Sequence, residues 1–225
     1  MRLLVALMTL AALAPVGALA QDTENAPGGS ISTERAAGAA PEAVGSAWSS
    51  SINVYAYLVP DGDDFLQPTV SADRGRLHLE ARYNYEGFNT GSLWVGYNLG
   101  LDGAVTLTFT PMVAAVIGDT DGVAPGYNLE ISWRRITFFS QSEYLIDTND
   151  SDNSFLYTWT ELSLWPWDWL GAGLVVQRTR TADLGFEAEP GLLLGLAWKQ
   201  LSIITYVFGL DESDQTVMVG AGLGF

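Results

Sequence analysis

The chain has 225 residues and no cysteine, and its 26 acidic and 10 basic residues give a formal net charge of −16 at pH 7. This charge balance argues against nucleic acid as a partner, because its phosphates would be repelled. The lack of cysteine excludes disulfides and a lipid-modified N-terminal cysteine, and it is compatible with the periplasm and the outer membrane.

The first twenty residues predict a secretory signal peptide. Arg2 supplies the positive n-region, Leu3 to Leu13 the apolar core, and Ala18-Leu19-Ala20 a cleavage site of small residues. The alternative is a membrane-anchoring helix, which is disfavoured because Pro15 and Gly17 interrupt the apolar run. Cleavage would remove one arginine and leave a net charge of −17.

Residues 21–46 predict a disordered leader. They are rich in alanine, glycine, glutamate, proline and serine, and Ile31 and Val44 are the only large β-branched apolar residues. This composition offers too little apolar surface to offset the entropy of ordering the segment. A plug or a partner-binding tail is the functional alternative for this stretch.

Alternating runs dominate the rest of the chain, which we treat as one unit over residues 47–225. From Arg76 to Glu86, odd-numbered residues such as Leu79 and Tyr83 are apolar, and even-numbered ones are charged or polar. A soluble sandwich would bury the apolar face, whereas a transmembrane barrel turns it to lipid and the charged face to the lumen. Twelve such runs lie near residues 50–59, 65–73, 76–86, 91–101, 104–117, 126–135, 137–147, 154–165, 168–179, 185–198, 200–210 and 215–225.

The connections between these runs alternate in length. Tight turns are expected at 74–75, 101–103, 135–136, 165–167 and 199–200, and the connections between them are longer, polar and acidic. Bacterial barrels have short periplasmic turns and longer outer loops. An open sheet edge would leave amides unpaired in lipid, so the sheet must close. The sequence therefore predicts an all-β fold, a twelve-stranded antiparallel transmembrane β-barrel with short periplasmic turns and acidic outer loops.

The last run ends on Phe225 and resembles the C-terminal signature of bacterial outer-membrane β-barrel proteins, which implies the barrel assembly machinery as a partner. Residues 57–99 (YLVPDGDDFLQPTVSADRGRLHLEARYNYEGFNTGSLWVGYNL) and 109–127 (FTPMVAAVIGDTDGVAPGY) are similar to an uncharacterised family of small bacterial outer-membrane barrels. The resemblance supports the fold and the bacterial outer membrane as compartment, with outer-membrane lipids and lipopolysaccharide as partners. It adds no catalytic residue.

Charged side chains gather on the predicted inward faces. A salt-bridged polar core and a narrow, charge-lined channel for small polar solutes both fit them, and a structural membrane barrel is the alternative to a channel. The tight turn at 74–75 predicts the pairs Asp73–Arg76, Ser71–His78, Thr69–Glu80 and Gln67–Arg82. The residues expected to line the lumen are Arg76, His78, Glu80, Arg82, Glu130, Arg134, Glu143, Glu161, Glu187 and Glu189.

Aromatic residues fall on both predicted faces. Inward rings can fill volume or bind sugars, whereas outward rings suit the headgroup level of a membrane. The inward set is Tyr55, Tyr57, Trp94, Tyr157 and Trp159, and the outward set is Tyr83, Tyr85, Tyr97, Tyr127, Trp133, Phe138, Tyr144 and Trp198.

A lipid-modifying hydrolase is the rival function from a different class. Ser71 and His78, with Asp73 or Glu80 to orient the ring, would form a Ser-His-acid set. Their predicted place near the periplasmic end of the lumen keeps a lipid ester out of reach. We therefore expect no enzyme activity and no cofactor.

Two further patterns concern acidic residues. Glu187 and Glu189 have a spacing that suits a glycosidase, but inward acids two residues apart arise freely in so acidic a chain. The outer loops could bind divalent cations and bridge to lipopolysaccharide phosphates, or could be solvated. Their acids are Asp61, Asp63, Asp64, Asp119, Asp121, Asp147, Asp150, Asp152, Asp211, Glu212 and Asp214.

Overall fold

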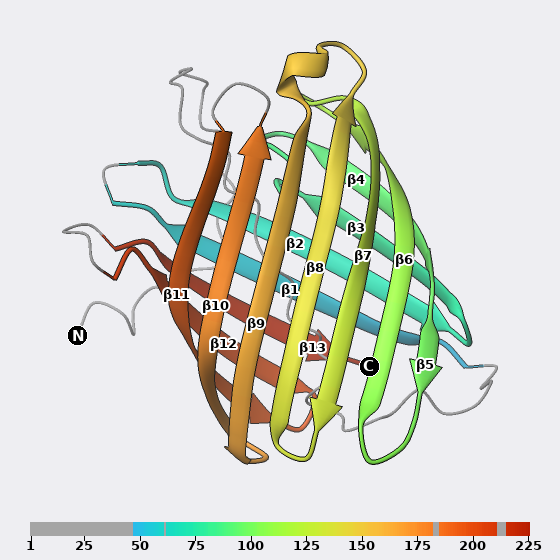
Figure 1. The fold of residues 1–225 in the computed structure, drawn as a ribbon, viewed down its shortest axis with the longest axis vertical. Helices are drawn as coiled ribbons and strands as arrows, with labels where there is room; N and C mark the ends of the chain where they lie inside the picture. Colours follow the sequence, from blue (N-terminus) through green and yellow to red (C-terminus); the bar gives the residue numbers. More distant parts are fainter. Residues whose placement is uncertain (1–46, 61, 182–184, 211–214) are drawn as a thin grey trace.

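The computed structural model describes residues 47–60, 62–181, 185–210 and 215–225, and the expected signal peptide and leader lie outside them. These residues form one antiparallel sheet that closes on itself (Figure 1). Among them, no helix is long and apolar enough to cross a membrane. The strands are β1 (Ser49–Leu58), β2 (Phe65–Arg74), β3 (Leu77–Tyr83), β4 (Gly91–Tyr97), β5 (Leu99–Leu101), β6 (Thr106–Ile117), β7 (Gly122–Trp133), β8 (Ile136–Asp147), β9 (Phe155–Trp167), β10 (Leu170–Thr181), β11 (Gly185–Trp198), β12 (Leu201–Phe208) and β13 (Val217–Gly224), and a 3-10 turn, η2, spans Ser151–Asn153.

The barrel has twelve strands because β4 and β5 are two parts of one strand. Both pair with β6 in a single register, Gly96 opposite Met112 and Leu99 opposite Phe109, with an interruption at Asn98. At the other join, β1 pairs with β13, and Ser50 and Phe225 exchange two backbone hydrogen bonds of 2.8 Å. The predicted strand number and antiparallel topology are confirmed.

The period of two separates an apolar outer face from a largely polar inner face. Leu162, Leu174 and Leu192 lie side by side on β9, β10 and β11, and all three are exposed. Their chain neighbours Glu161 and Val175 are buried inside. An exposed apolar wall around a closed sheet is stable in hydrocarbon, which identifies the fold as a transmembrane barrel.

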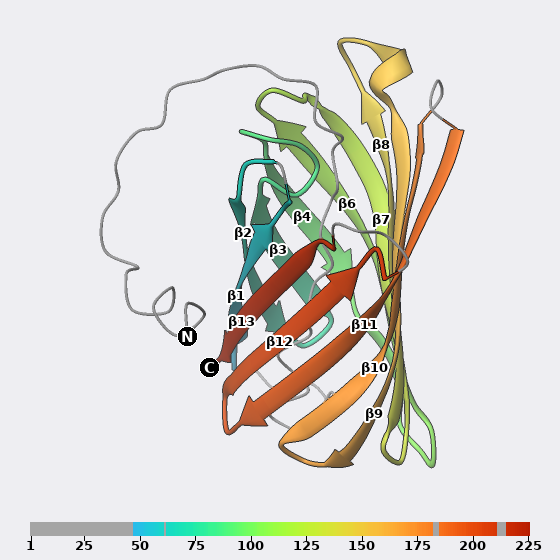
Figure 2. The same cartoon turned by 90° about the vertical axis from the view of Figure 1, so that its left-hand side faces the viewer.

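The two ends of the barrel differ in their connections (Figure 2). At one end, four hairpins have turns of two residues. The last paired residues before these turns are Arg74–Leu77, Trp133–Ile136, Trp167–Leu170 and Trp198–Leu201. A fifth connection at this end, residues 102–105, has four residues, as many as the connection 118–121 at the opposite end. The hairpin of β8, η2 and β9 rises furthest at that opposite end. Four of the five predicted short connections are thus two-residue turns.

The hairpin of β2 and β3 differs from its predicted register by two residues. Gly75 has a φ of 60°, which glycine tolerates best, so the turn is Gly75-Arg76 rather than residues 74–75. Asp73 consequently lies opposite His78, and Ser71 lies opposite Glu80. The four predicted pairs, Asp73–Arg76, Ser71–His78, Thr69–Glu80 and Gln67–Arg82, are therefore wrong.

The end of β3 corrects the predicted face of Tyr85. The strand stops at Tyr83, and Asn84 follows with a φ of 55°, a conformation that interrupts the alternation. Two hydrogen bonds stabilise this bend. The backbone N–H of Asn89 donates to Asn84 Oδ1 (2.9 Å), and Asn84 Nδ2 donates to the Leu66 carbonyl (3.0 Å). Tyr83 is 45% exposed, but Tyr85 is 1% exposed and packs inside the barrel.

At the end with short turns, Trp165 lies against the inner wall. The turn there is Asp168-Trp169 rather than 165–167, and the pairing of β9 with β10 shifts between Leu170 and Ala172. A Cβ atom on Gly171 would lie 2.4 Å from Trp165 Cδ2, and one on Gly195 would lie 2.8 Å from Trp165 Cη2. Both glycines therefore make room for the indole.

We predict that Gly171→Ala lowers the free energy of unfolding by about 1–3 kcal/mol, because the new methyl group overlaps the indole of Trp165. Urea unfolding of the refolded protein in detergent measures the change. Ala172→Val, on the exposed outer face of the same strand, is the control and should unfold like the wild type. Trp165→Ala should relieve most of the penalty, and an unchanged midpoint for Gly171→Ala alone would contradict the packing.

Candidate functional site: the inner wall of the barrel

A single guanidinium, Arg82 on β3, lies among three carboxylates. Its Nε donates to Glu80, and its Nη1 donates to Glu143 Oε2 at 2.8 Å and lies 3.9 Å from Glu86 Oε1. All four side chains are at most 4% exposed. Three carboxyl groups thus share one guanidinium in this cluster.

Two aromatic rings hold this guanidinium from its faces. The Arg82 Cζ atom lies 4.2 Å from the ring centroid of Tyr85 and 4.3 Å from that of Trp94, within the range of a cation–π contact. Tyr85 reaches this place only because the bend at Asn84 turns it inward. The ring pair restricts where the charge can lie.

Glu86 joins the cluster from the loop that follows β3. Its Oε1 accepts hydrogen bonds from Ser92 Oγ at 2.6 Å and from Trp94 Nε1 at 3.2 Å. Burial raises the pKa of the Glu86 carboxyl above its ordinary value, and the nearby charge of Arg82 opposes this shift. The alternation predicted for residues 76–86 places Glu86 on the polar face, but nothing in the sequence indicates that it joins Arg82, and it is absent from the residues expected to line the lumen.

His78 extends the cluster toward the end with short turns. Its Nδ1 lies 2.8 Å from Asp73 Oδ1 and its Nε2 lies 3.5 Å from Glu80 Oε2. Ser71 is directed elsewhere, since its hydroxyl lies 2.7 Å from that of Ser51. The corrected register thus removes the Ser71–His78 pair that the hydrolase hypothesis requires.

On the opposite wall, neutral donors hold the carboxylates. Glu161 Oε1 accepts from Trp159 Nε1 at 2.8 Å and from the Tyr206 hydroxyl at 2.7 Å. Gln177 Nε2 donates to Glu189 on the neighbouring strand. These donors position the two acids on the inner wall.

The register places acids on three successive inward rows of strands β7 to β11. Glu143 and Glu187 share one row, Glu189 lies on the next, and Glu130 and Glu161 share the third. Rows are two residues apart, or about 6.6 Å along the strands. In the described part of the chain, the inward carboxylates are Asp73, Glu80, Glu86, Glu130, Glu143, Asp147, Glu161, Glu187 and Glu189, and Arg82 and His78 are their cationic partners.

Two arginines that were expected in the lumen lie outside it. Arg76 occupies a tight turn, is fully exposed and donates from Nη1 to the Tyr97 hydroxyl at 2.9 Å. Arg134 occupies another tight turn, with a φ of 54°, and its Cζ lies 4.8 Å from the Trp133 ring centroid. Both turns begin one residue away from their predicted place, so these predictions are wrong.

The other expected lumen residues lie on the inner wall with different exposure. His78, Glu80, Arg82, Glu143 and Glu161 are buried, and Glu130 is half-buried. Glu187 and Glu189 are exposed near the end with long loops, where β11 extends beyond its pairing with β12.

Several buried oxygen atoms on this wall have no hydrogen-bond partner within the described residues. Folded proteins rarely leave such atoms unpaired, so this surface suits water or a polar solute. The atoms are Glu86 Oε2, Glu143 Oε1, the hydroxyls of Tyr57 and Tyr157, and Oε1 of Gln67 and Gln177.

The described loop aspartates serve local hydrogen bonds. Asp147 Oδ1 accepts from the backbone of Asn149 (2.7 Å) and Asp150 (2.9 Å), and Asp121 Oδ1 accepts from that of Gly118 (3.1 Å). Within the described ranges, no group of three or more acidic, histidine or cysteine residues is placed to hold a metal ion. Asp61, Asp211, Glu212 and Asp214 lie outside the described residues.

Comparison with known proteins supports the fold. No family model and no curated protein matches the chain. A solved structure described as KdgM porin matches with a TM-score of 0.61 at 10% identity, over 78% of this chain and 99% of that one. OpdK of Pseudomonas aeruginosa matches with a TM-score of 0.42 at 12% identity, over 73% of this chain and 58% of that one. The chain thus shares its barrel architecture with a porin.

We predict that Arg82→Met lowers the free energy of unfolding by about 3–5 kcal/mol, because Glu80 and Glu143 lose a buried partner. Urea unfolding in detergent measures the loss. Adding Glu143→Gln should recover part of it, since one unpaired carboxylate is removed. Arg135→Met, in an exposed turn, is the matched control. Equal midpoints for Arg82→Met and Arg135→Met would contradict the buried cluster.

Proposed function

We propose that the protein is a bacterial outer-membrane channel whose acid-lined lumen favours small cations and cationic polar solutes. One observation carries the proposal: the described inner wall holds nine carboxylates against Arg82 and His78. The closed transmembrane barrel and the likeness in fold to a porin support the outer-membrane location.

Charge on the wall of a narrow passage acts strongly on passing ions. A lumen between low-dielectric walls focuses the field of its fixed charges, so acids concentrate cations and exclude anions. The acids lie on three successive rows. Glu143 and Glu187 are on the first, Glu189 is on the second, and Glu130 and Glu161 are on the third. A cation can therefore pass from one site of negative potential to the next.

A structural barrel is the second candidate, and one feature favours it. The hydrogen bond between Arg82 and Glu143 joins β3 to β8, and the bond from Tyr206 to Glu161 joins β12 to β9. Neither pair of strands is adjacent in the sheet, so both bonds cross the interior. Such links stiffen the barrel and narrow any passage.

Planar-bilayer recording of the full chain tests the proposal. A potassium chloride gradient should give a reversal potential that shows preference for potassium over chloride. The double variant Glu187→Gln/Glu189→Gln should weaken that preference, because two exposed inward charges are lost. Asp168→Asn, in an exposed turn outside the lumen, should leave it unchanged.

The recording separates the candidate functions. Chloride preference, or equal selectivity of wild type and double variant, would reject the acid-lined passage. A silent bilayer with protein that is folded by its gel mobility would favour the structural barrel.

A further inference from the structure

Basic residues on the outer surface divide into two groups. Among the described residues, five exposed basic side chains lie in or beside the tight turns, and each has a partner. Arg74 lies over Trp48, Arg76 over Tyr97, Arg134 over Trp133 and Lys199 over Trp198, at 4.8–5.8 Å from the ring centroids, and Arg135 pairs with Asp168. Cation–π contacts with interfacial rings suit the headgroup level of one leaflet.

Arg178 and Arg180 form the second group, on β10 in the half nearer the long loops. Their neighbours Gln177 and Thr179 lie opposite Glu189 and Glu187 on the inner face, so both arginines point outward. Both are exposed. No ion pair, hydrogen bond or ring contact joins either guanidinium to another described residue.

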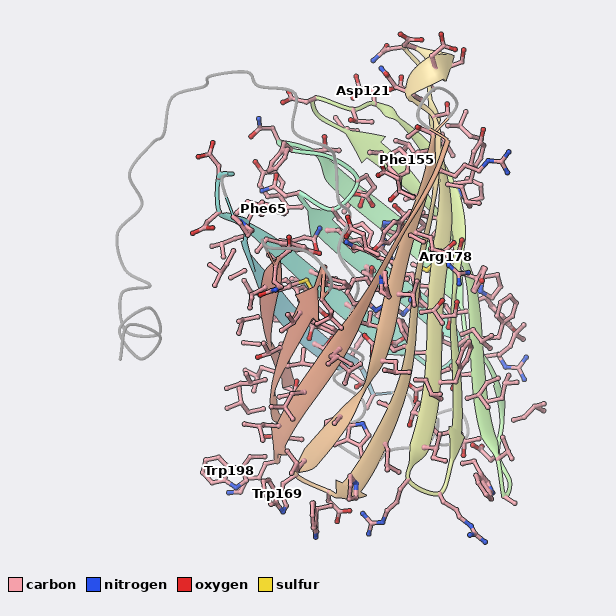
Figure 3. The ribbon with its side chains drawn as sticks, turned by 60° about the vertical axis from the view of Figure 1, so that its left-hand side comes forward. Phe65, Asp121, Phe155, Trp169, Arg178 and Trp198 are labelled. Carbon is pink, nitrogen blue, oxygen red and sulfur yellow. The ribbon has the colours of Figure 1, made fainter. Side chains whose placement is uncertain are left out.

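The height of these arginines matches the edge of a membrane. Figure 3 shows Arg178 between Asp121 at the loop end and Trp169 and Trp198 at the turn end. From Leu170, beside the lower tryptophans, β10 rises about 26 Å along the strand to Arg178 and about 33 Å to Arg180. With a strand tilt of about 40°, the vertical rise is about 20 Å to Arg178 and about 25 Å to Arg180, so Arg180 lies at the edge of an apolar band about 25 Å tall and Arg178 about 5 Å inside it, within reach of the edge for a long side chain.

The outer wall around the two arginines carries both apolar and hydroxyl side chains, and Arg180 itself lies opposite the exposed Leu156. Below Arg178 the wall is apolar, with Leu174 on the same strand and Leu162 and Leu192 beside it. Thr158 lies next to Arg178 in register, and its hydroxyl is 3.0 Å from that of Ser142. Ser142 Oγ in turn donates to the Tyr157 carbonyl at 2.9 Å. The wall satisfies these hydroxyls itself and leaves the two guanidinium groups for an external partner.

We propose that Arg178 and Arg180 bind the phosphate groups of lipids in the leaflet on the loop side of the barrel. Guanidinium groups recognise phosphate with paired hydrogen bonds, and residues two apart on a strand lie about 6.6 Å from each other. Lipids hold their phosphates at this level, so the ligand is delivered to the site by the membrane. This assignment is independent of whether the lumen conducts.

Binding of diphosphorylated lipid A to the folded protein in detergent tests the proposal. Arg178→Gln/Arg180→Gln should bind about 30-fold more weakly than the wild type, the effect expected for two arginines near an anionic surface. Arg134→Gln/Arg135→Gln, at the opposite end, should bind like the wild type. Dephosphorylated lipid should bind the wild type and the Arg178/Arg180 variant equally weakly.

A charge-preserving variant tests whether weaker binding comes from the lost charges and not from a misfolded barrel. Arg178→Lys/Arg180→Lys should keep most of the affinity, and gel mobility reports the folded barrel for every variant. Wild-type affinity in the double glutamine variant would overturn the proposal, and so would equal binding of dephosphorylated lipid by the wild type. Competition by inorganic phosphate at the same concentration as the lipid would overturn the assignment to a lipid.

Discussion

Backbone hydrogen bonding in hydrocarbon is the constraint on which this structure depends. A peptide group inside a bilayer has no water to bond, so every strand needs a partner on each side. The chain meets this need at both ends of the sheet: β13 returns to β1, with Phe225 bonded to Ser50, and the interrupted strand of β4 and β5 pairs with β6. Closure then fixes which side chains face lipid and which face inward.

The inward face shows which contacts stabilise charged side chains away from bulk water. Isolated buried charges are costly, and the structure responds with two kinds of contact. Around Arg82 a cation and two aromatic rings gather carboxylates, whereas Glu161 relies on neutral donors from Trp159 and Tyr206. The wall therefore combines ion pairs with hydrogen bonds from neutral donors.

The alternation of apolar and polar residues predicted the strands well, because each short segment shows it independently of the rest of the chain. The faces of β3 and β10 follow directly from it. The predictions were wrong where a single residue interrupts the alternation or shifts a turn. Gly75 is the first residue of its turn, which changes the β2–β3 register by two residues, and the bend at Asn84 places Tyr85 in the interior instead of against lipid. The start of β7 was placed too late, at residue 126, because Gly122 and Pro125 are typical of turns.

Contacts across the lumen could not be predicted from the sequence, for a different reason. The bond from Arg82 to Glu143 joins residues 61 apart in the chain, and the stagger of strands around the barrel decides which inward side chains meet. Strand count and alternation leave that stagger undetermined. The same holds for Glu86, whose position depends on the loop after Asn84.

The central claim is that adjacent residues of one strand face hydrocarbon and interior in turn. Because the chain has no cysteine, a single Leu174→Cys or Gln177→Cys variant can carry one fluorophore in liposomes that contain nitroxide-labelled lipid. We expect strong quenching for the label at 174, on the outer wall, and weak quenching for the label at 177, on the inner wall. Equal quenching at the two positions would contradict it.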